Sequence, residues 1–454
     1  MKIIIVGCGK VGSSLAKSLN EDGNDIVIID KNADLIDKIT STLDVMGIAG
    51  NGTSHAIQVE AGVKDADLLL AVTDSDEQNL LTCLMAKIAG NCRTIARVRN
   101  HIYNEEINFI RNELGLSMTI NPEEASAKEI ARILKYPSAT KVDTFAKGRV
   151  ELMTLRIPDD SILDNKRIMD IIPSLKTNVL ICAVERGEET IIPDGSFVLK
   201  AKDKISIIIQ PSEIHKFFKK ISLNVKKVKD AMIVGGGRIA HYLAKELIEN
   251  DIKVKIIDIN HKRCQELSEL LPNATIIHGD GTDQALLLEE GIETTDAFIS
   301  LTNLDEENIL LSLYADSITK GKVVTKIDRI TFKSVINNLN IGSLVSPKAV
   351  TASNILQYVR ALKNASGNNV ETLYQIVEDK VEALAFKVND KARVINTSLS
   401  QLNLKKNLLI CCIIRDERII TPGGKDEIKV GDVVIVVTTN RGLTDLNDIL
   451  QEEV

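Results

Sequence analysis

Short aliphatic runs alternate with amphipathic stretches through the first hundred residues of the chain. The runs of Ile, Val, Leu and Ala that predict strands are 3–6, 25–29, 68–72 and 94–98. The stretches whose apolar residues recur with helical spacing are 13–20, 33–43 and 79–89. Strands that alternate with helices predict a parallel, doubly wound α/β sheet. Because the strands are aliphatic throughout, we expect both faces of this sheet to be buried.

A different pattern follows in the next part of the chain. Residues 152–157, 180–185 and 204–209 read as strands, 168–172 as a helix, and Pro193-Asp194-Gly195 as a turn. This is the pattern of a small α/β domain of roughly 70–80 residues. A similar pattern returns from about residue 381 to 437.

The chain repeats itself. Residues 7–12 (Gly-Cys-Gly-Lys-Val-Gly) match 235–240 (Gly-Gly-Gly-Arg-Ile-Ala) at an offset of 228, from 7 to 235. Other pairs keep an offset of 228 or 229, and they are Asp30 with Asp258, Thr73 with Thr302, Glu77 with Glu306, Asn79 with Asn308, and 50–53 with 279–282. One long register with few slips indicates two copies of one unit. The predicted domains are 1–136, 137–225, 226–366 and 367–454, with boundaries near Tyr136-Pro137, the lysine-rich 216–229 stretch and Ser366-Gly367-Asn368-Asn369.

A glycine motif lies between the first strand and the first helix. Gly7 permits a tight turn, Gly9 lets a phosphate approach the backbone, and Gly12 lets the helix pack closely, as in a Rossmann dinucleotide-binding turn. The helix N-terminus offers free N–H groups to phosphates. Asp30 ends the second strand, where a carboxylate accepts hydrogen bonds from both ribose hydroxyls and repels the 2′-phosphate of NADP. The alternative is a glycine turn in a fold that binds no ligand.

The second unit keeps this motif with Ala240 in place of the third glycine, a change that the motif tolerates. Lys10 and Arg238 occupy equivalent positions, where each can reach a terminal phosphate or remain a solvated surface charge. The candidate nucleotide-binding residues of the first unit are Gly7, Cys8, Gly9, Lys10, Val11, Asp30, Thr73, Asp74, Arg97 and Arg99. Those of the second unit are Gly235, Gly236, Gly237, Arg238, Ile239, Asp258 and Thr302.

Polar residues follow the later strands of the first unit. Thr73-Asp74 comes after one strand and Arg97 and Arg99 leave the next, so all lie at the carboxyl edge where ligands bind in such sheets. Arg97 and Arg99 share one face of their strand. They either contact a nucleotide or form ion pairs with Asp74 or Asp76. We expect His55, after the 50–53 turn, to be a surface residue.

Composition narrows the classes of function. The net charge is -7, aromatic residues make up 3%, and Trp is absent, so we expect aliphatic cores and no nucleic-acid partner. The local lysine cluster (Lys216, Lys219, Lys220, Lys226, Lys227 and Lys229) reads as a solvated linker. The seven cysteines form no CxxC pair and read as buried, reduced thiols. The chain shows no signal-peptide pattern and no apolar run near ~18 residues, so we expect a cytoplasmic protein.

At these motifs the chain resembles the RCK family, the regulators of potassium conductance, also called KTN domains. The segments that carry the resemblance are 7–12, Asp30, 50–53, 72–79, 97–99 and Asn121-Pro122-Glu123-Glu124, each unit being followed by the small C-terminal domain of the family. The resemblance covers essentially the whole chain. It implies two tandem units, each a Rossmann domain followed by a small RCK C-terminal domain.

The resemblance also implies ligands and partners. Family members bind NAD, NADH, ATP or ADP, form homo-oligomeric rings, here expected to be tetrameric, and gate a membrane-embedded potassium transporter subunit of the Trk type. In ring-forming relatives the glutamate after the proline binds a cation near the nucleotide phosphates, and that residue is Glu123 here. The second unit has Lys348 at this position and Asp328 in place of Arg99, so a metal is expected in the first unit alone.

Two other classes of function remain open. An NAD-dependent oxidoreductase needs a substrate domain with a general acid or base, and the regions after the Rossmann domains are short, β-rich and poor in His. A redox-responsive DNA-binding regulator needs a helix-turn-helix and a basic face, for which the segmentation leaves no room. We therefore expect a nucleotide-sensing regulator without catalytic residues.

Overall fold

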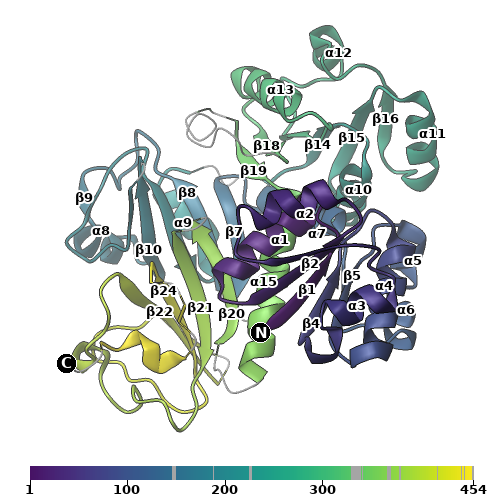
Figure 1. The fold of residues 1–454 in the computed structure, drawn as a ribbon. Coiled ribbons are helices and arrows are strands. Elements are labelled where there is room, and N and C mark those ends of the chain that lie inside the picture. The colour runs from purple at the N-terminus through teal and green to yellow at the C-terminus, as the bar shows by residue number, and fades with distance from the viewer. Residues whose placement is uncertain are drawn as a thin grey trace.

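Two six-stranded parallel sheets dominate the computed structural model (Figure 1). It describes residues 1–145, 150–187, 189–223, 227–328, 339, 341–365, 370–377, 380–416, 418–440, 442–443 and 445–451. The first sheet has the order β3-β2-β1-β4-β5-β6. Its strands are β1 (Lys2–Val6), β2 (Asp25–Asp30), β3 (Met46–Ala49), β4 (Leu68–Ala71), β5 (Arg93–Arg97) and β6 (Met118–Ile120). This is the doubly wound order in which ligands bind beside β1 and β4.

Helices cover this sheet on both faces, and α1 shows why they pack there. In α1, Gly12, Leu15, Ala16 and Leu19 are buried at helical spacing. The helices of this part are α1 (Lys10–Glu21), α2 (Ala33–Thr40), α3 (His55–Glu60), α4 (Asp76–Gly90), α5 (His101–Glu105), α6 (Ile107–Glu113) and α7 (Pro122–Lys135). The predicted strands and helices are confirmed to within a few residues. The edge strands β3 and β6 lay outside the prediction because both are short.

The second Rossmann sheet repeats the first in the order β16-β15-β14-β17-β18-β19. Its strands are β14 (Asp230–Val234), β15 (Lys253–Asp258), β16 (Thr275–His278), β17 (Ala297–Ser300), β18 (Lys322–Lys326) and β19 (Ser343–Val345). Its helices are α10 (Arg238–Glu249), α11 (His261–Leu270), α12 (Gln284–Glu289), α13 (Asp305–Ile318) and α15 (Pro347–Ala365). The predicted duplication is therefore present in three dimensions.

The small domains are antiparallel sheets of five strands, ordered β11-β10-β13-β8-β7 and β20-β21-β24-β22-β23. The first contains β7 (Ala139–Phe145), β8 (Val150–Arg156), β10 (Val179–Arg186), β11 (Glu189–Ile191) and β13 (Lys204–Ile209), with β9 (Lys166–Arg167), β12 (Val198–Leu199), α8 (Ile168–Leu175) and α9 (Pro211–Lys220). The second contains β20 (Val370–Val377), β21 (Val381–Lys387), β22 (Leu408–Arg415), β23 (Arg418–Ile420) and β24 (Val433–Thr438). The two sheets pack against each other through one apolar cluster that includes Leu152, Cys182, Cys411 and Val437.

The lysine-rich stretch is not a linker throughout, which corrects the expectation from composition. Lys216, Lys219 and Lys220 lie on α9, whose Phe217 and Phe218 are buried in the core of the first small domain. The predicted boundaries at 225/226 and 366/367, together with Lys226, lie outside the described residues. The four domain bounds therefore stay predictions.

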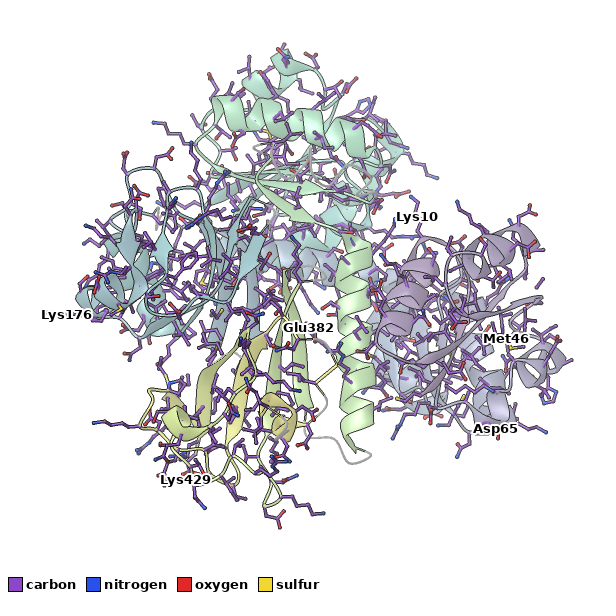
Figure 2. All side chains as sticks on the ribbon, turned by 60° about the vertical axis from the view of Figure 1, so that its left-hand side comes forward. Lys10, Met46, Asp65, Lys176, Glu382 and Lys429 are labelled. Atoms are coloured by element: carbon purple, nitrogen blue, oxygen red, sulfur yellow. The ribbon has the colours of Figure 1, made fainter. Side chains whose placement is uncertain are left out.

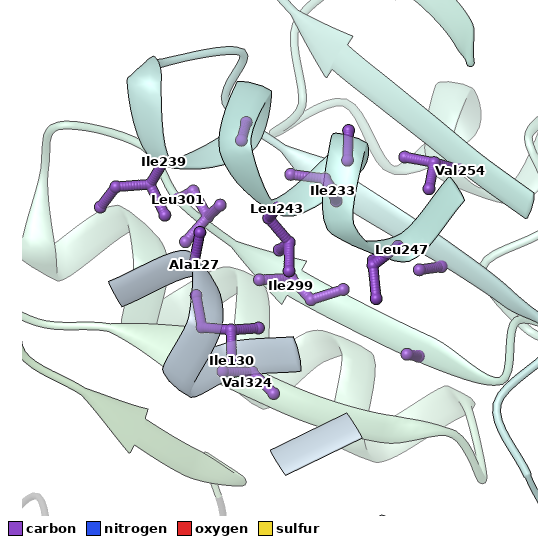
Figure 3. Close-up of a cluster of buried hydrophobic side chains, with 14 of the residues drawn as sticks. Ala127, Ile130, Ile233, Ile239, Leu243, Leu247, Val254, Ile299, Leu301 and Val324 are labelled. Atoms are coloured by element: carbon purple, nitrogen blue, oxygen red, sulfur yellow. The ribbon is translucent and has the colours of Figure 1, made fainter. Parts of the chain in front are cut away.

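The last helix of each Rossmann part crosses to the other half of the chain. Ala127, Ile130 and Leu134 of α7 lie in the core of the second sheet, beside Leu243 of α10 (Figure 3). Conversely, Ile355, Leu356 and Val359 of α15 lie in the core of the first sheet. These apolar faces of α7 and α15 thus pair the two halves within one chain.

The crossover also joins the halves through charge. Arg360 of α15 pairs with Asp22, at the end of α1, at 2.5 Å, and with Glu382 of β21 at 3.4 Å. All three side chains are largely buried. Figure 2 shows α15 as the long helix between the first Rossmann domain, where Lys10 is labelled, and the strand that carries Glu382. A movement of the first Rossmann domain therefore displaces Arg360 and changes its contact with the small domain of the other half.

Candidate nucleotide-binding sites

Two glycines of the first loop are required by the fold itself. Gly7 has φ +102, which favours glycine, and a Cβ there would lie 2.9 Å from the backbone nitrogen of Thr73. A Cβ on Gly12 would overlap the carbonyl oxygen of Gly7. These two positions explain the turn and the close helix packing without any ligand.

Gly9 has no such structural reason to be glycine. Its backbone has φ -66 and ψ -167, which any residue adopts, and a Cβ there would meet nothing within 4 Å. Gly237 repeats this with φ -66, ψ -171 and the same open space. Helices α1 and α10 begin at these residues without a side-chain cap, so their first N–H groups face the open space. An anion is the natural occupant of such a position.

The predicted ribose carboxylates are held in place by the backbone. Asp30 Oδ2 accepts a hydrogen bond from Cys8 N at 2.5 Å, and its Oδ1 accepts one from Asn32 N at 2.9 Å. Asp258 does the same with Gly236 N at 2.6 Å and Asn260 N at 2.7 Å. A carboxylate offers about four acceptor positions, so each aspartate can still accept ribose hydroxyls while the loop fixes its orientation.

A buried asparagine shapes the loop after β4. Asn79 is fully buried, accepts from Thr73 N at 2.8 Å, and donates to the carbonyl of Arg97 at 2.9 Å. Asn308 makes the equivalent bonds to Thr302 and to the carbonyl of Lys326. The repeat pointed to both asparagines, although the sequence did not reveal their role. They fix the predicted Thr73 and Thr302 beside the glycine loops.

Arg97 and Arg99 form the ion pairs that were left open as an alternative. Arg97 Nη2 lies 3.3 Å from Asp74 Oδ1, and Arg99 Nε lies 3.7 Å from Asp76 Oδ1. Burial, and then the neighbouring Arg99, lower the pKa of Arg97 from its usual value. The Asp74 side chain is fully exposed, so an incoming phosphate can replace it as the partner of Arg97.

Glu123 faces the same arginine from the start of α7. Its charge acts on Arg97, and its Oε2 is buried without a hydrogen-bond partner among the described residues. A carboxylate oxygen of this kind fits a cation held between Glu123 and phosphates. The described residues contain no group of three or more His, Cys, Asp or Glu that could hold a metal ion by themselves. A metal at Glu123 therefore requires the nucleotide as a further ligand and stays a prediction.

In the second unit, lysines stand at the positions equivalent to Arg97 and Glu123. Lys326 Nζ lies 3.1 Å from the carbonyl of Thr302 and 3.5 Å from Asp328 Oδ2. Lys348 Nζ donates to the carbonyl of Asp328 at 2.5 Å. The two sites are therefore chemically different, as the substitutions in the sequence suggested.

Of the remaining predicted residues, Lys10 and Arg238 are exposed at the first turn of their helices, next to Gly9 and Gly237. His55 is exposed at the start of α3, as expected. All seven cysteines are buried and free, which confirms that expectation. No helix among the described residues is long and apolar enough to cross a membrane.

Sequence reasoning missed Tyr242 entirely. This side chain of α10 in the second unit reaches the first site, where its Oη accepts from Asn121 at 3.0 Å and from Asn104 at 3.2 Å. The repeat carried a signal, because Tyr242 stands where the first unit has Ser14. An aromatic residue that replaces a serine on the helix after a glycine loop marks a contact specific to one half.

Comparison with known proteins decides the family. The model of the TrkA-N domain matches residues 3–122 and 231–347, and that of the TrkA-C domain matches 152–222 and 384–451. The chain belongs to the TrkA family of potassium uptake proteins. It is 33% identical over 444 residues to the Trk system potassium uptake protein TrkA homolog 1 of Methanosarcina mazei, covering 96% of this chain and 97% of that protein. It is 32% identical to TrkA of Haemophilus influenzae, with 99% of each chain covered.

Solved structures support the same fold for this TrkA-family chain. The GsuK RCK domain matches with a TM-score of 0.61 and 18% identity, over 97% of this chain and 93% of that one. A GsuK channel bound to NAD matches with a TM-score of 0.61 and 17% identity, over 97% of this chain and 77% of that one. With the TrkA-N and TrkA-C domains each matched twice, this likeness confirms the predicted tandem architecture.

Proposed function

We propose that this chain is a nucleotide-sensing regulatory subunit of a potassium uptake system, which gates a membrane-embedded partner of the Trk type. The observation that carries the proposal is the open space at Gly9 and Gly237, which neither the backbone nor the packing requires. Family membership supports the potassium system. GsuK channels with this fold bind NAD in one case and ADP in another.

The proposed ligands are NAD or NADH and, at the same edges, ATP or ADP. The pyrophosphate would lie on the N-termini of α1 and α10, with Asp30 and Asp258 as ribose acceptors. Lys10, Arg238, Arg97 and Arg99 are placed to receive further phosphates. A cation at Glu123 would neutralise phosphate charge in the first unit alone.

Signalling follows from linkage. A ligand shifts a conformational equilibrium only through its different affinities for the two states. Because α7 and α15 lie in the cores of opposite halves, a shift at one glycine loop is transmitted to the other half. The ion pairs of Arg360 extend the path to β21 of the second small domain. This path supports a coupled change of the whole chain.

Assembly would use the outer face of α4, where apolar residues recur at helical spacing. Leu81 is 48% and Ile88 72% exposed, with Leu84 and Met85 half-buried between them. Leu310 of α13 is 67% exposed at the position equivalent to Leu81. A stripe of this kind marks a contact surface. We propose that it joins copies into a homo-oligomeric ring, a tetramer, at the cytoplasmic side of the membrane partner.

No observation favours the oxidoreductase alternative. The apolar faces of the two small sheets pack against each other, so these faces are not available to a substrate. We propose no catalytic role for any residue.

The test is calorimetric titration of the full chain with NADH and with ATP. The proposal requires at least one of them to bind more tightly than ~1 mM, which is about −4 kcal/mol. Potassium uptake by vesicles that hold the chain and its membrane partner should then respond to the same nucleotide. If neither nucleotide binds in this range, the sensing function is wrong.

A further inference from the structure

The two ribose edges share one framework. In both units the aspartate accepts one hydrogen bond from the glycine loop and one from the backbone N–H of the asparagine two residues after the aspartate. The distances are 2.5 and 2.9 Å for Asp30 and 2.6 and 2.7 Å for Asp258. The strand, the loop and the following helix also correspond. Any difference in ligand preference at this edge must therefore come from the side chains around the aspartate.

Those side chains differ in charge. In the first unit the positions after the aspartate include Ala33, Asp34 and Leu35, and Ala49 ends β3. In the second unit the corresponding residues are His261, Lys262, Arg263 and His278. A carboxylate and three apolar residues are thus replaced by two cations and two imidazoles. At a fifth position the first unit has the cation, Lys31, where the second has Ile259. Over these five positions the second unit therefore has one more cation and one carboxylate fewer.

Contacts bring these residues together at the edge. The rings of His261 and His278 are 5.1 Å apart and edge-on. His278 Nε2 lies 3.1 Å from the carbonyl oxygen of Ile259, the residue directly after Asp258. His261, Lys262 and His278 are exposed to solvent, so a ligand at Asp258 can meet them.

Arg263 reaches further toward the loop. Its Nε donates to the carbonyl of Gly236 at 2.7 Å, and its Nη1 lies 3.0 Å from Glu266 Oε2. The amide of the same Gly236 donates to Asp258. The guanidinium is therefore held beside both the phosphate loop and the ribose carboxylate, and Leu35 offers no such group in the first unit.

The charges around Asp258 favour a ligand with a phosphate on its ribose. A carboxylate alone at the end of this strand repels a phosphate on the ribose, whereas a nearby arginine accommodates one. Arginine is suited to phosphate recognition by its fork of donors. In the second unit Arg263, paired with Glu266, and Lys262 follow Asp258, whereas the residues at these two positions after Asp30 are Leu35 and Asp34.

We propose that the second unit binds an adenosine nucleotide that carries a phosphate on its ribose, the NADP(H) class, while the first unit binds nucleotides with a free ribose. This assignment rests on the proposed nucleotide-binding function and divides it between the two units. The chain would then compare two nucleotide pools, one at each glycine loop.

The experiment uses two probes of equal phosphate content, adenosine 2′,5′-bisphosphate and ADP. Each is titrated calorimetrically into full-length Gly9→Val, which blocks the first loop, and into Gly237→Val, which blocks the second. We expect Gly9→Val to bind the 2′,5′-bisphosphate about tenfold more tightly than ADP, the effect of one charge-assisted contact. Gly237→Val should prefer ADP.

Two further variants assign the preference to the side chains. Arg263→Leu introduces the first-unit residue, and Lys262→Asp changes an exposed position without touching the core. Each, in the Gly9→Val background, should reduce the preference, with NADPH against NADH as a second probe pair.

The outcomes separate the two levels of the proposal. Suppose that the wild type binds ADP. If Gly9→Val then binds both probes equally, prefers ADP or binds neither probe, the assignment to the second unit is wrong, whereas the proposed sensing function stands. If the wild type binds no nucleotide, the proposed function itself has failed.

Discussion

The hydroxyl of Tyr242 accepts a hydrogen bond from the side-chain amide of Asn121 at 3.0 Å. Tyr242 lies one turn after Arg238 on the helix that begins at the second glycine loop, and Asn121 caps α7, next to Glu123 of the first site. The bond therefore links the two candidate nucleotide sites by a short path through one helix turn.

Tyr242→Phe should weaken this link without creating a cavity. Loss of the shared acceptor leaves the amides of Asn121 and Asn104 without it, at a cost of ~1–2 kcal/mol in the free energy of unfolding. The affinity for a nucleotide at one site should then depend less on occupancy of the other. Calorimetric titration with and without the second nucleotide measures this coupling.

Tyr358→Phe on α15 is the matched control, since Tyr358 packs against the core of the first sheet and takes no part in the hydrogen bonds of Asn121 and Asn104 described above. Its stability and coupling should equal those of the wild type. An unchanged coupling in Tyr242→Phe would exclude this path between the sites.

Ile130→Ala should destabilise the second Rossmann domain although residue 130 belongs to the first unit. Ile130 is fully buried among residues of the second sheet, and such a truncation costs ~2–5 kcal/mol. Hydrogen exchange should show faster opening of β14 and α10. The mirror variant Ile355→Ala should instead expose β1 and α1, and the opposite pattern would show that the crossover does not hold in solution.

Glu129 makes the junction of α7 with the first small domain sensitive to pH. Burial, and then the charge of Asp143, raise the pKa of Glu129 to about 7, against the influence of Arg132 and Lys141. Because the folded state holds this proton more tightly than the unfolded state, its contribution to stability is complete below about pH 4.5 and is lost as the pH rises through 7.

Glu129→Gln removes the titration. It should flatten the pH dependence of the free energy of unfolding between about pH 4.5 and 7 and stabilise the chain above pH 7 by on the order of 1–2 kcal/mol. Chemical denaturation at several pH values measures this. Asp170→Asn, an exposed carboxylate of α8, is the control and should leave the profile unchanged, and a profile equally steep in Glu129→Gln would refute the assignment.

Leu81→Lys should weaken self-association while leaving nucleotide binding intact. A charge in the middle of the apolar stripe of α4 must be desolvated in any contact that covers it. Light scattering of the full chain at equal concentrations measures the effect. Lys17→Glu on α1, an exposed position away from the stripe, is the control, and an unchanged particle mass in Leu81→Lys would place the ring contact elsewhere.

The sequence predicted what is local or repeated. The glycine loop, Asp30 and the aliphatic strands follow from spacing alone, and the register of the repeat carried them to the second unit. The destination of α7 could not be predicted, because an apolar helix face such as Ile130–Leu134 fits either of two nearly equal sheets. The contact of Tyr242 with Asn121 depends on that crossover, so it could not be predicted either. The ion pairs of Arg97 and Arg99 remained open because spacing does not decide between a carboxylate and a phosphate as partner.

The most direct test of the account is the nucleotide affinity of Gly9→Val combined with Gly237→Val. A Cβ at either position meets no protein atom within 4 Å, so the variant should fold while the added side chains fill the proposed phosphate positions. Its stability should fall by about 1 kcal/mol per site, because Gly9 and Gly237 are N-caps, where valine is less favourable than glycine. Calorimetry should show NADH and ATP binding weakened by at least about 100-fold, the loss of two or more charge-assisted hydrogen bonds. Binding equal to that of the wild type would contradict the account, because the open space at the two loops would then hold no phosphate.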